Sequence, residues 1–357
     1  MAMKLMLLPS VRSKFVKDEN MKLIYRTLLV LSVIMIISNY YMYSFMYAVK
    51  LALMIVVAVI ATVETEILFY SHDKNITREV SKDLIQKSYP KITALIYVLL
   101  IPVGTPLWLV AIGAIMGTMF GKLLFGGFHH MIFHTSLVGV MFVTLGWSQL
   151  SLGVDFITAF DNYIIELIFN NDFFNNTLAL KGDYDPANMT SAIGMLTNGT
   201  PYKTLDVLLG ITPGIIVSGL ALIVAGGFLI YKKAINWVTP LTTLLSFTFV
   251  AVIIALVNGQ SMLYPLQHVL TGSLLFVLLF VVSDPITTPI PLKGKIIYGV
   301  IAGALAMFIR NGIKYEEGII FGVLFMSMLT PMINQELKKK PVKKTPPKKV
   351  ETVKEGV

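Results

Sequence analysis

The chain has 357 residues, of which 55% are hydrophobic and only 14% are charged, with a mean hydropathy of +0.75. A soluble domain carries about 25% charged residues, so this composition excludes an ordinary soluble protein and predicts an integral membrane protein. The absence of cysteine excludes disulfides and Cys-ligated clusters, and the net charge of +9 is spread over a terminal arm, loops and a tail, which argues against nucleic-acid binding.

Hydrophobic runs between Gly, Pro and charged residues predict about ten transmembrane helices, because a membrane helix needs about 20 mostly apolar residues. We expect these helices at 23–39, 46–70, 91–103, 105–125, 135–151, 211–231, 237–257, 264–282, 295–311 and 316–333. The predicted fold class is therefore an all-α integral membrane protein.

The hydrophobic runs divide the chain into five expected parts. These are a cytoplasmic N-terminal arm (1–22), a first membrane half (23–151), an outer loop (152–210), a second membrane half (211–334) and a disordered basic cytoplasmic tail (335–357). The tail "QELKKKPVKKTPPKKVETVKEGV" is too polar to fold by itself.

The basic residues predict the orientation in the membrane. Lys and Arg gather in the N-terminal arm, in loops 71–91, 231–236 and 283–295, and in the tail. With an even number of spans all of these segments lie on one side, which the positive-inside rule makes cytoplasmic. The loop 152–210, rich in Asp and Asn, is then expected outside.

Two Thr-Pro breaks suggest an internal repeat. "VGTPLW" separates the third and fourth runs, and "SDPITTPIP" separates the eighth and ninth. With five spans per half, the breaks occupy equivalent positions on opposite membrane faces, as two inverted five-helix repeats would place them. The alternative is that Pro merely marks loops.

Ionisable residues inside hydrophobic runs are functional candidates, because charge in a bilayer is costly. For Glu64 and Glu66 we favour an interfacial position where Glu66 reaches water. His268, in the eighth run, is expected to satisfy a partner helix.

Several segments resemble one family. "VVSDPITTPIPLKGKIIYGVIAGALAMFIRNGIKYEEGIIFGVLFMSMLTPMIN" is similar to the C-terminal region shared by the B subunit of the sodium-translocating NADH:quinone reductase (Nqr) and the D subunit of the Rnf complex. "PSVRSK", "FGKLLFGGFHHMIFHTSLVG" and "QHVLTGSLLFVLLFVVSDP" resemble further family segments. The resemblance runs from about Pro9 to Asn334.

The resemblance implies a covalent flavin. Members of this family carry FMN joined through its phosphate to a threonine of a Ser/Thr-Gly-Ala-Thr pattern, and "TNGTP" falls at that place. Thr200 is then the phosphoester acceptor, with Thr197, Asn198, Gly199 and Pro201 around it. Two alternatives involve no flavin: an N-glycosylation sequon at Asn198, or a turn in which Thr200 or Thr204 caps the next helix.

The resemblance also implies further cofactor-binding residues. They are Gly126 and Gly127 of the Gly-Gly segment and Asp284, Thr287 and Thr288 of the "DPITTP" element, with Asp284 in a structural role beside a cofactor. A second, non-covalent flavin such as riboflavin is a further expectation, which the changed residues of 129–136 put in question. No metal site is expected, although His130 and His134 would share a face, as haem or metal ligands do, if their stretch were helical.

The function implied is a membrane electron-transfer subunit of an Rnf-type ferredoxin:NAD⁺ oxidoreductase that couples flavin redox steps to Na⁺ or H⁺ translocation. The chain then acts as part of a translocase in a bacterial inner membrane, beside iron–sulfur, flavin and NAD-binding subunits and lipid. The short N-terminal arm favours Rnf over the Nqr B subunit. A non-redox transporter or channel with inverted repeats is the alternative from another class.

Overall fold

The computed structural model describes residues 16–42, 45–73, 77–147, 208, 218–312 and 317–338. Every regular element in these ranges is a helix, so the predicted all-α class is confirmed for the described chain. The motif at 197–201 and most of the predicted outer loop lie outside the described residues.

The helices of the first half are α1 (Asp18–Met42), α2 (Phe45–Asp73), α3 (Arg78–Gln86), α4 (Pro90–Val98), α5 (Leu107–Gly121), the short 3₁₀ helices η1 (Leu123–Phe125) and η2 (Phe128–His130), and α6 (Thr135–Gly146). Those of the second half are α12 (Gly219–Tyr231), α13 (Val238–Val257), α14 (Tyr264–Leu270), α15 (Leu274–Phe280), α16 (Leu292–Gly312) and α17 (Gly318–Lys338).

The chain is a multi-pass membrane protein. Six helices in the described ranges are long and apolar enough to cross a membrane, and each predicted hydrophobic run overlaps a described helix. The run 264–282 differs from expectation, because it forms two short helices, α14 and α15, separated at Thr271–Ser273 by Gly272 with φ 71°. Positive φ is accessible to Gly because it lacks a Cβ.

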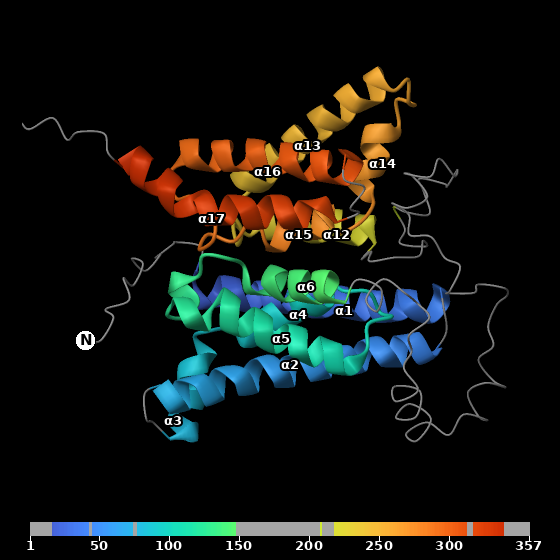
Figure 1. Ribbon diagram of the computed structural model, residues 1–357. Helices are drawn as coiled ribbons and strands as arrows, with labels where there is room; N and C mark the ends of the chain where they lie inside the picture. Colours follow the sequence, from blue (N-terminus) through green and yellow to red (C-terminus); the bar gives the residue numbers. More distant parts are fainter. Residues whose placement is uncertain are drawn as a thin grey trace, which may run out of the picture.

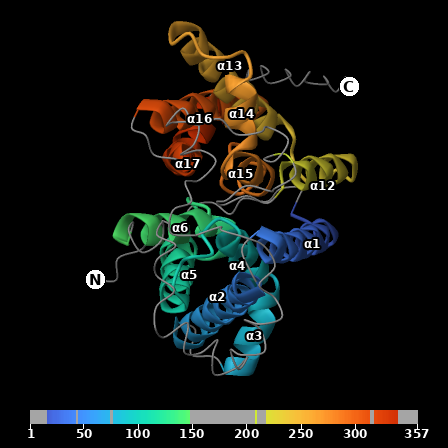
Figure 2. The ribbon, with the colours of Figure 1, turned by 90° about the vertical axis from the view of Figure 1, so that its right-hand side faces the viewer.

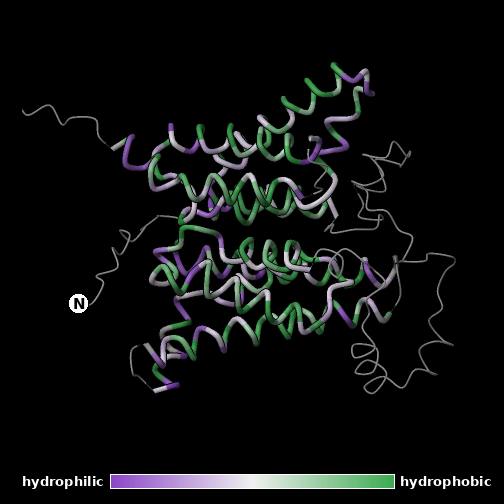
Figure 3. Tube along the Cα trace, viewed as in Figure 1, coloured by the Kyte–Doolittle hydropathy of each residue, from purple (hydrophilic) through white to green (hydrophobic). Residues whose placement is uncertain are grey.

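The two halves lie against each other with their helices roughly aligned (Figures 1 and 2). α1–α6 form one body and α12–α17 the other, and one continuous cluster of buried apolar side chains includes residues of both. Hydrophobic residues fill the middle of the helices, whereas hydrophilic residues gather towards the helix ends (Figure 3). This distribution matches a slab of hydrocarbon between two aqueous surfaces.

We call one end of the molecule the basic end. α1, α4, α6, α13 and α16 begin there, as their colours in Figure 1 show, and α2, α5, α12 and α17 finish there. The loop between α12 and α13, which carries Lys232 and Lys233, and the start of α16, with Lys293 and Lys295, belong to this end. α6 ends and α12 begins at the opposite end.

Glycines allow the closest helix contacts. A Cβ at Gly117 of α5 would come within 2.8 Å of the Thr135 carbonyl oxygen of α6. A Cβ at Gly303 of α16 would come within 2.3 Å of the Thr243 carbonyl oxygen of α13. Small residues at such crossings let backbones approach, which drives association where the lipid tails are as apolar as the side chains.

Candidate functional site

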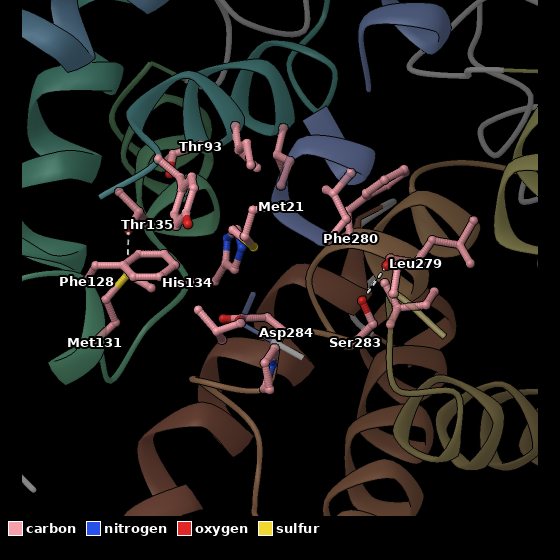
Figure 4. Close-up of a pocket in the computed structure, with 18 residues that line it drawn as sticks. Met21, Thr93, Phe128, Met131, His134, Thr135, Leu279, Phe280, Ser283 and Asp284 are labelled. Carbon is pink, nitrogen blue, oxygen red and sulfur yellow. Dashed lines mark hydrogen bonds between the residues drawn. The ribbon is translucent and has the colours of Figure 1, made fainter. Parts of the chain in front are cut away.

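A cavity of about 60 Å³ lies between the two halves at the basic end. The first half contributes residues of α1, α4, η2 and the start of α6. The second half contributes the loop between α12 and α13, α15 and the segment that follows α15. His134 and Asp284 enter the space from opposite halves (Figure 4). The cavity therefore joins two sequence motifs that are 150 residues apart in the chain.

The "DPITTP" element forms a compact turn around Asp284. The Asp284 carboxylate accepts a hydrogen bond from Ile286 N (3.2 Å) and another from Thr287 Oγ1 (3.1 Å). Thr288 Oγ1 donates to the Asp284 carbonyl at 2.6 Å. The predicted Asp284, Thr287 and Thr288 thus act together, because the hydrogen bonds of their side chains are made within the turn itself.

This turn is also tied to α17. Thr330 Oγ1 donates to the Thr287 carbonyl at 3.1 Å, and Ile290 N donates to Asn334 Oδ1 at 3.0 Å. The break therefore has a fixed shape, and Asp284 is held at the cavity wall by hydrogen bonds at both ends of the turn.

The Gly-Gly segment supplies the opposite wall. Gly126 and Gly127 have φ of 103° and 99°, and a Cβ at Gly127 would come within 2.7 Å of Tyr70 Oη. Gly127 N donates to the Lys122 carbonyl at 3.0 Å, which turns the chain into η2. The glycines do not line the cavity themselves, but they position Phe128, which does.

His134 precedes α6 and lines the cavity. Its Nδ1 is buried and has no hydrogen-bond partner among the described residues. Burial and, to a smaller extent, the positive charge of Lys122 lower the pKa of His134 to about 4. The imidazole is therefore neutral at physiological pH and can either donate or accept a hydrogen bond in the cavity.

Glu66 departs from the sequence prediction. Glu66 and Lys122 form a fully buried ion pair, with Lys122 Nζ 2.6 Å from Glu66 Oε1. Lys122 Nζ also donates to the Ser88 carbonyl at 2.7 Å and lies 5.4 Å from the centre of the Phe128 ring. The contact with water expected for Glu66 is wrong, because the cation that follows α5 makes burial of the carboxylate possible.

The neighbouring acid behaves as expected. Glu64 lies in an exposed ion pair with Arg78 of α3. Lys122 was missed by sequence reasoning, although a signal was present: Glu66 and Lys122 are opposite charges in two predicted spans, and such charges pair inside membranes.

The histidine-rich stretch 129–134 is not one helix. η2 ends at His130 and α6 begins at Thr135, so His130 and His134 do not share a helix face. No group of three or more His or acidic residues that could hold a metal ion occurs among the described residues.

A second polar cluster surrounds the α14–α15 break, near the opposite end of the molecule. Arg310 Nη1 of α16 donates to the His268 carbonyl at 2.7 Å, and Ser273 N donates to Glu317 Oε2 at 3.2 Å. Both His268 ring nitrogens are buried without a hydrogen-bond partner in the described chain, and its ring lies against Tyr264. Sequence reasoning considered His268 but missed Arg310 and Glu317.

Asp284 gives the site a pH dependence. Burial raises the pKa of Asp284 from 3.8 to about 6, against the hydrogen bonds that lower it. Because the pKa of Asp284 is raised in the folded protein, this carboxyl group stabilises the fold fully below about pH 4, and the stabilisation is lost as the pH rises through about 6. Because the carboxyl is only partly buried, we expect the free energy of unfolding to fall by only about 1–2 kcal/mol between pH 4 and pH 7.

Thermal unfolding in detergent at pH 4 and pH 7 measures this loss. Asp284→Asn keeps an acceptor for Ile286 N. In this variant the unfolding temperatures at the two pH values should differ less than in the wild-type protein. Glu64→Gln removes an exposed acid at the same end and should leave the difference unchanged. An Asp284→Asn variant with the wild-type pH dependence would contradict the assignment.

Comparison with known proteins places the chain in a family. A model of the NQR2, RnfD, RnfE family matches residues 12–343. The chain is 27% identical over 313 residues to the D subunit of the ion-translocating oxidoreductase complex of Actinobacillus succinogenes, covering 81% of this chain and 82% of that protein. It is 29% identical to the D subunits of the same complex in Haemophilus ducreyi and Colwellia psychrerythraea, in each case over 68% of this chain and 74% of the relative. The match spans both halves and both walls of the cavity, and the chain belongs to the NQR2, RnfD, RnfE family.

Proposed function

We propose that this chain is the membrane electron-transfer subunit of an Rnf-type ion-translocating oxidoreductase complex, with FMN attached to Thr200. The observation that carries the proposal is the similarity, over 81% of the chain, to a protein named as the D subunit of an ion-translocating oxidoreductase complex. Ferredoxin and NAD⁺ are the proposed electron partners of the complex, and Na⁺ or H⁺ is the proposed coupling ion. Iron–sulfur, flavin and NAD-binding subunits are the proposed neighbours.

Leu208, which follows the motif at 197–201, contacts the start of α12 at the end of the molecule opposite the basic end. Ser218 Oγ, at the start of α12, donates to the Leu208 carbonyl at 3.1 Å. Thr200 precedes Leu208 by eight residues, and a fully extended chain of that length spans roughly 28 Å. The proposed flavin on Thr200 would be tethered within this reach of that end, and FMN would supply one-electron and two-electron redox chemistry there.

Two further features support the proposed topology. α2 packs on α5 and α5 on α6 in the first half, as α13 packs on α16 and α16 on α17 in the second. The breaks of residues 99–106 and 281–291 lie towards opposite ends of the molecule (Figure 1). We propose two inverted five-helix repeats with about ten spans in a bacterial inner membrane, with the basic end and both termini cytoplasmic and loop 152–210 outside.

A second, non-covalent flavin remains a prediction without an assigned site. The inter-half cavity measures about 60 Å³, whereas pockets that hold drug-sized ligands measure about 300–1,000 Å³. Phe128, Met131 and His134 occupy one of its walls. A cavity of this size accommodates a few water molecules rather than a flavin ring.

The two breaks also favour a second candidate function, an inverted-repeat transporter without redox chemistry, because interrupted helices bind small solutes near the bilayer midplane. One experiment separates the two functions. The protein is expressed with its natural flavin transferase and run on a denaturing gel. We expect flavin fluorescence in the protein band, and a mass increase matching FMN on the peptide that contains Thr200.

Thr200→Val should abolish the fluorescence while the protein level stays the same, because valine has the shape of threonine without the hydroxyl. Thr204→Val, in the same segment, should keep the fluorescence. An unmodified Thr200 peptide from the wild-type protein would favour the transporter, and fluorescence in Thr200→Val would place the flavin elsewhere.

A further inference from the structure

An apolar groove of about 310 Å³ opens between α12, α13 and α15. α12 contributes Leu222, Ile223, Gly226, Gly227 and Ile230, and the other walls are Trp237 and apolar residues of α13 and α15. A Cβ at Gly226 would come within 2.6 Å of Leu279 Cδ2, so this glycine lets α12 approach α15. At Gly227 a Cβ would meet nothing within 4 Å, so the groove is open there.

The length of the groove along α12 is close to the thickness of one membrane leaflet. Its lining on α12 runs from Leu222 to Ile230, which is about 12 Å of helix at 1.5 Å per residue. The hydrocarbon core of a bilayer is about 30 Å thick, so one leaflet contributes about 15 Å. A transmembrane helix of another protein requires a seam along the whole span, whereas an acyl chain from one leaflet fits this length.

The segment that joins the two groove walls carries positive charge and aromatic rings at the basic end. Ile230 is the last lining residue of α12 and Trp237 the first beside α13, and Lys232 and Lys233 lie between them, both exposed. The Trp237 side chain is also exposed, at 53%. Trp favours the headgroup level of a membrane, and basic residues at the ends of grooves between membrane helices attract anionic headgroups.

An unfilled apolar groove forfeits the dispersion contacts of all its lining atoms. We propose that this groove binds an anionic phospholipid of the leaflet at the basic end, with one acyl chain between α12 and α13 and the phosphate at Lys232 and Lys233. Three observations match the parts of such a lipid: the groove is apolar, its length is that of one leaflet, and cations lie where the headgroup would be. The site is separate from the inter-half cavity and is independent of any flavin.

Photo-crosslinking of the intact complex tests the proposal. The complex is reconstituted with photoactivatable phosphatidylglycerol or with photoactivatable phosphatidylcholine as the neutral probe, and the labelled peptides are identified by mass spectrometry. We expect phosphatidylglycerol to label peptides of α12 and α13 at least severalfold more than phosphatidylcholine does. Equal labelling by the two lipids, or labelling spread evenly over all lipid-facing helices, would show an ordinary annular lipid and overturn the proposal.

Two matched pairs of variants define the site. Gly227→Leu adds a side chain in the groove, at a position where a Cβ meets nothing within 4 Å, and should abolish the labelling of α12. Gly146→Leu, where a Cβ also meets nothing within 4 Å, should leave the labelling unchanged. Lys232→Gln with Lys233→Gln should remove the preference for phosphatidylglycerol, whereas Lys91→Gln, an exposed lysine of α4, should retain it. Lipid labelling of a neighbouring protein in place of α12, or wild-type labelling of Gly227→Leu, would overturn the proposal.

Discussion

Replacing Lys122 by Met should lower the free energy of unfolding by about 3–5 kcal/mol, because it leaves the Glu66 carboxylate buried without its cation. Both side chains are fully buried, and Lys122 Nζ lies 2.6 Å from Glu66 Oε1. Water cannot replace the lost partner at such a position, so the unpaired buried charge of Glu66 destabilises the Lys122→Met variant. Titration with a denaturing detergent from native micelles measures the difference.

A double-mutant cycle separates the ion pair from packing. Lys122→Met combined with Glu66→Leu removes both charges, and its stability should return close to that of the wild-type protein, since well-packed apolar residues commonly replace a buried pair without loss. Lys87→Met removes an exposed lysine at the same end and should change stability by less than about 0.5 kcal/mol. Additive losses in the double variant would show that Lys122 and Glu66 do not interact.

The pair also determines the shape of the candidate site. Lys122 Nζ donates to the Ser88 carbonyl, next to Tyr89, and lies over the Phe128 ring. Tyr89 and Phe128 both line the inter-half cavity. One buried cation therefore fixes two of the cavity walls, one from the segment before α4 and one from η2, and loss of the cation should alter both.

Hydrophobicity was sufficient to locate the long apolar helices, but not α3, which lies in a predicted loop. The predicted run 237–257 became α13 at Val238–Val257, and the run 295–311 became α16 at Leu292–Gly312. Apolar length is what a bilayer requires, so local composition decides whether a span forms. The break between α14 and α15 was not predicted, because "HVLTGSLLF" contains no Pro, and Gly272 marks the break only through its positive φ.

The candidate site was predicted less completely than the fold. The motif around Asp284 was identified, and its internal hydrogen bonds to Ile286 and Thr287 follow from Asp in a turn. Its position opposite His134 was not predictable, because that contact joins the two halves and depends on how helices far apart in sequence pack. Both Lys122 and Glu66 lie in predicted spans, but the contact between them was not predictable for the same reason, because they are 56 residues apart.

Replacing Glu317 by Leu should lower the free energy of unfolding by about 2–4 kcal/mol, because two hydrogen bonds to its carboxylate are lost at the α14–α15 break. Ser273, the N-cap of α15, donates to Glu317 Oε2 from both its backbone N–H and its hydroxyl. A leucine leaves the Ser273 N–H buried without an acceptor. Glu317→Gln keeps an acceptor oxygen and should lose no more than about 1–2 kcal/mol.

Glu317 and Arg310 together stabilise an interrupted helix by the same electrostatic principle. A helix carries partial positive charge at its N-terminus and partial negative charge at its C-terminus, and the Glu317 carboxylate lies at the start of α15 while Arg310 donates to the His268 carbonyl in the last turn of α14. Arg310→Met should therefore destabilise the same α14–α15 break. Hydrogen exchange should show faster exchange of the 264–280 amides in both variants and no change in α2, and uniform exchange across the protein would contradict this local role.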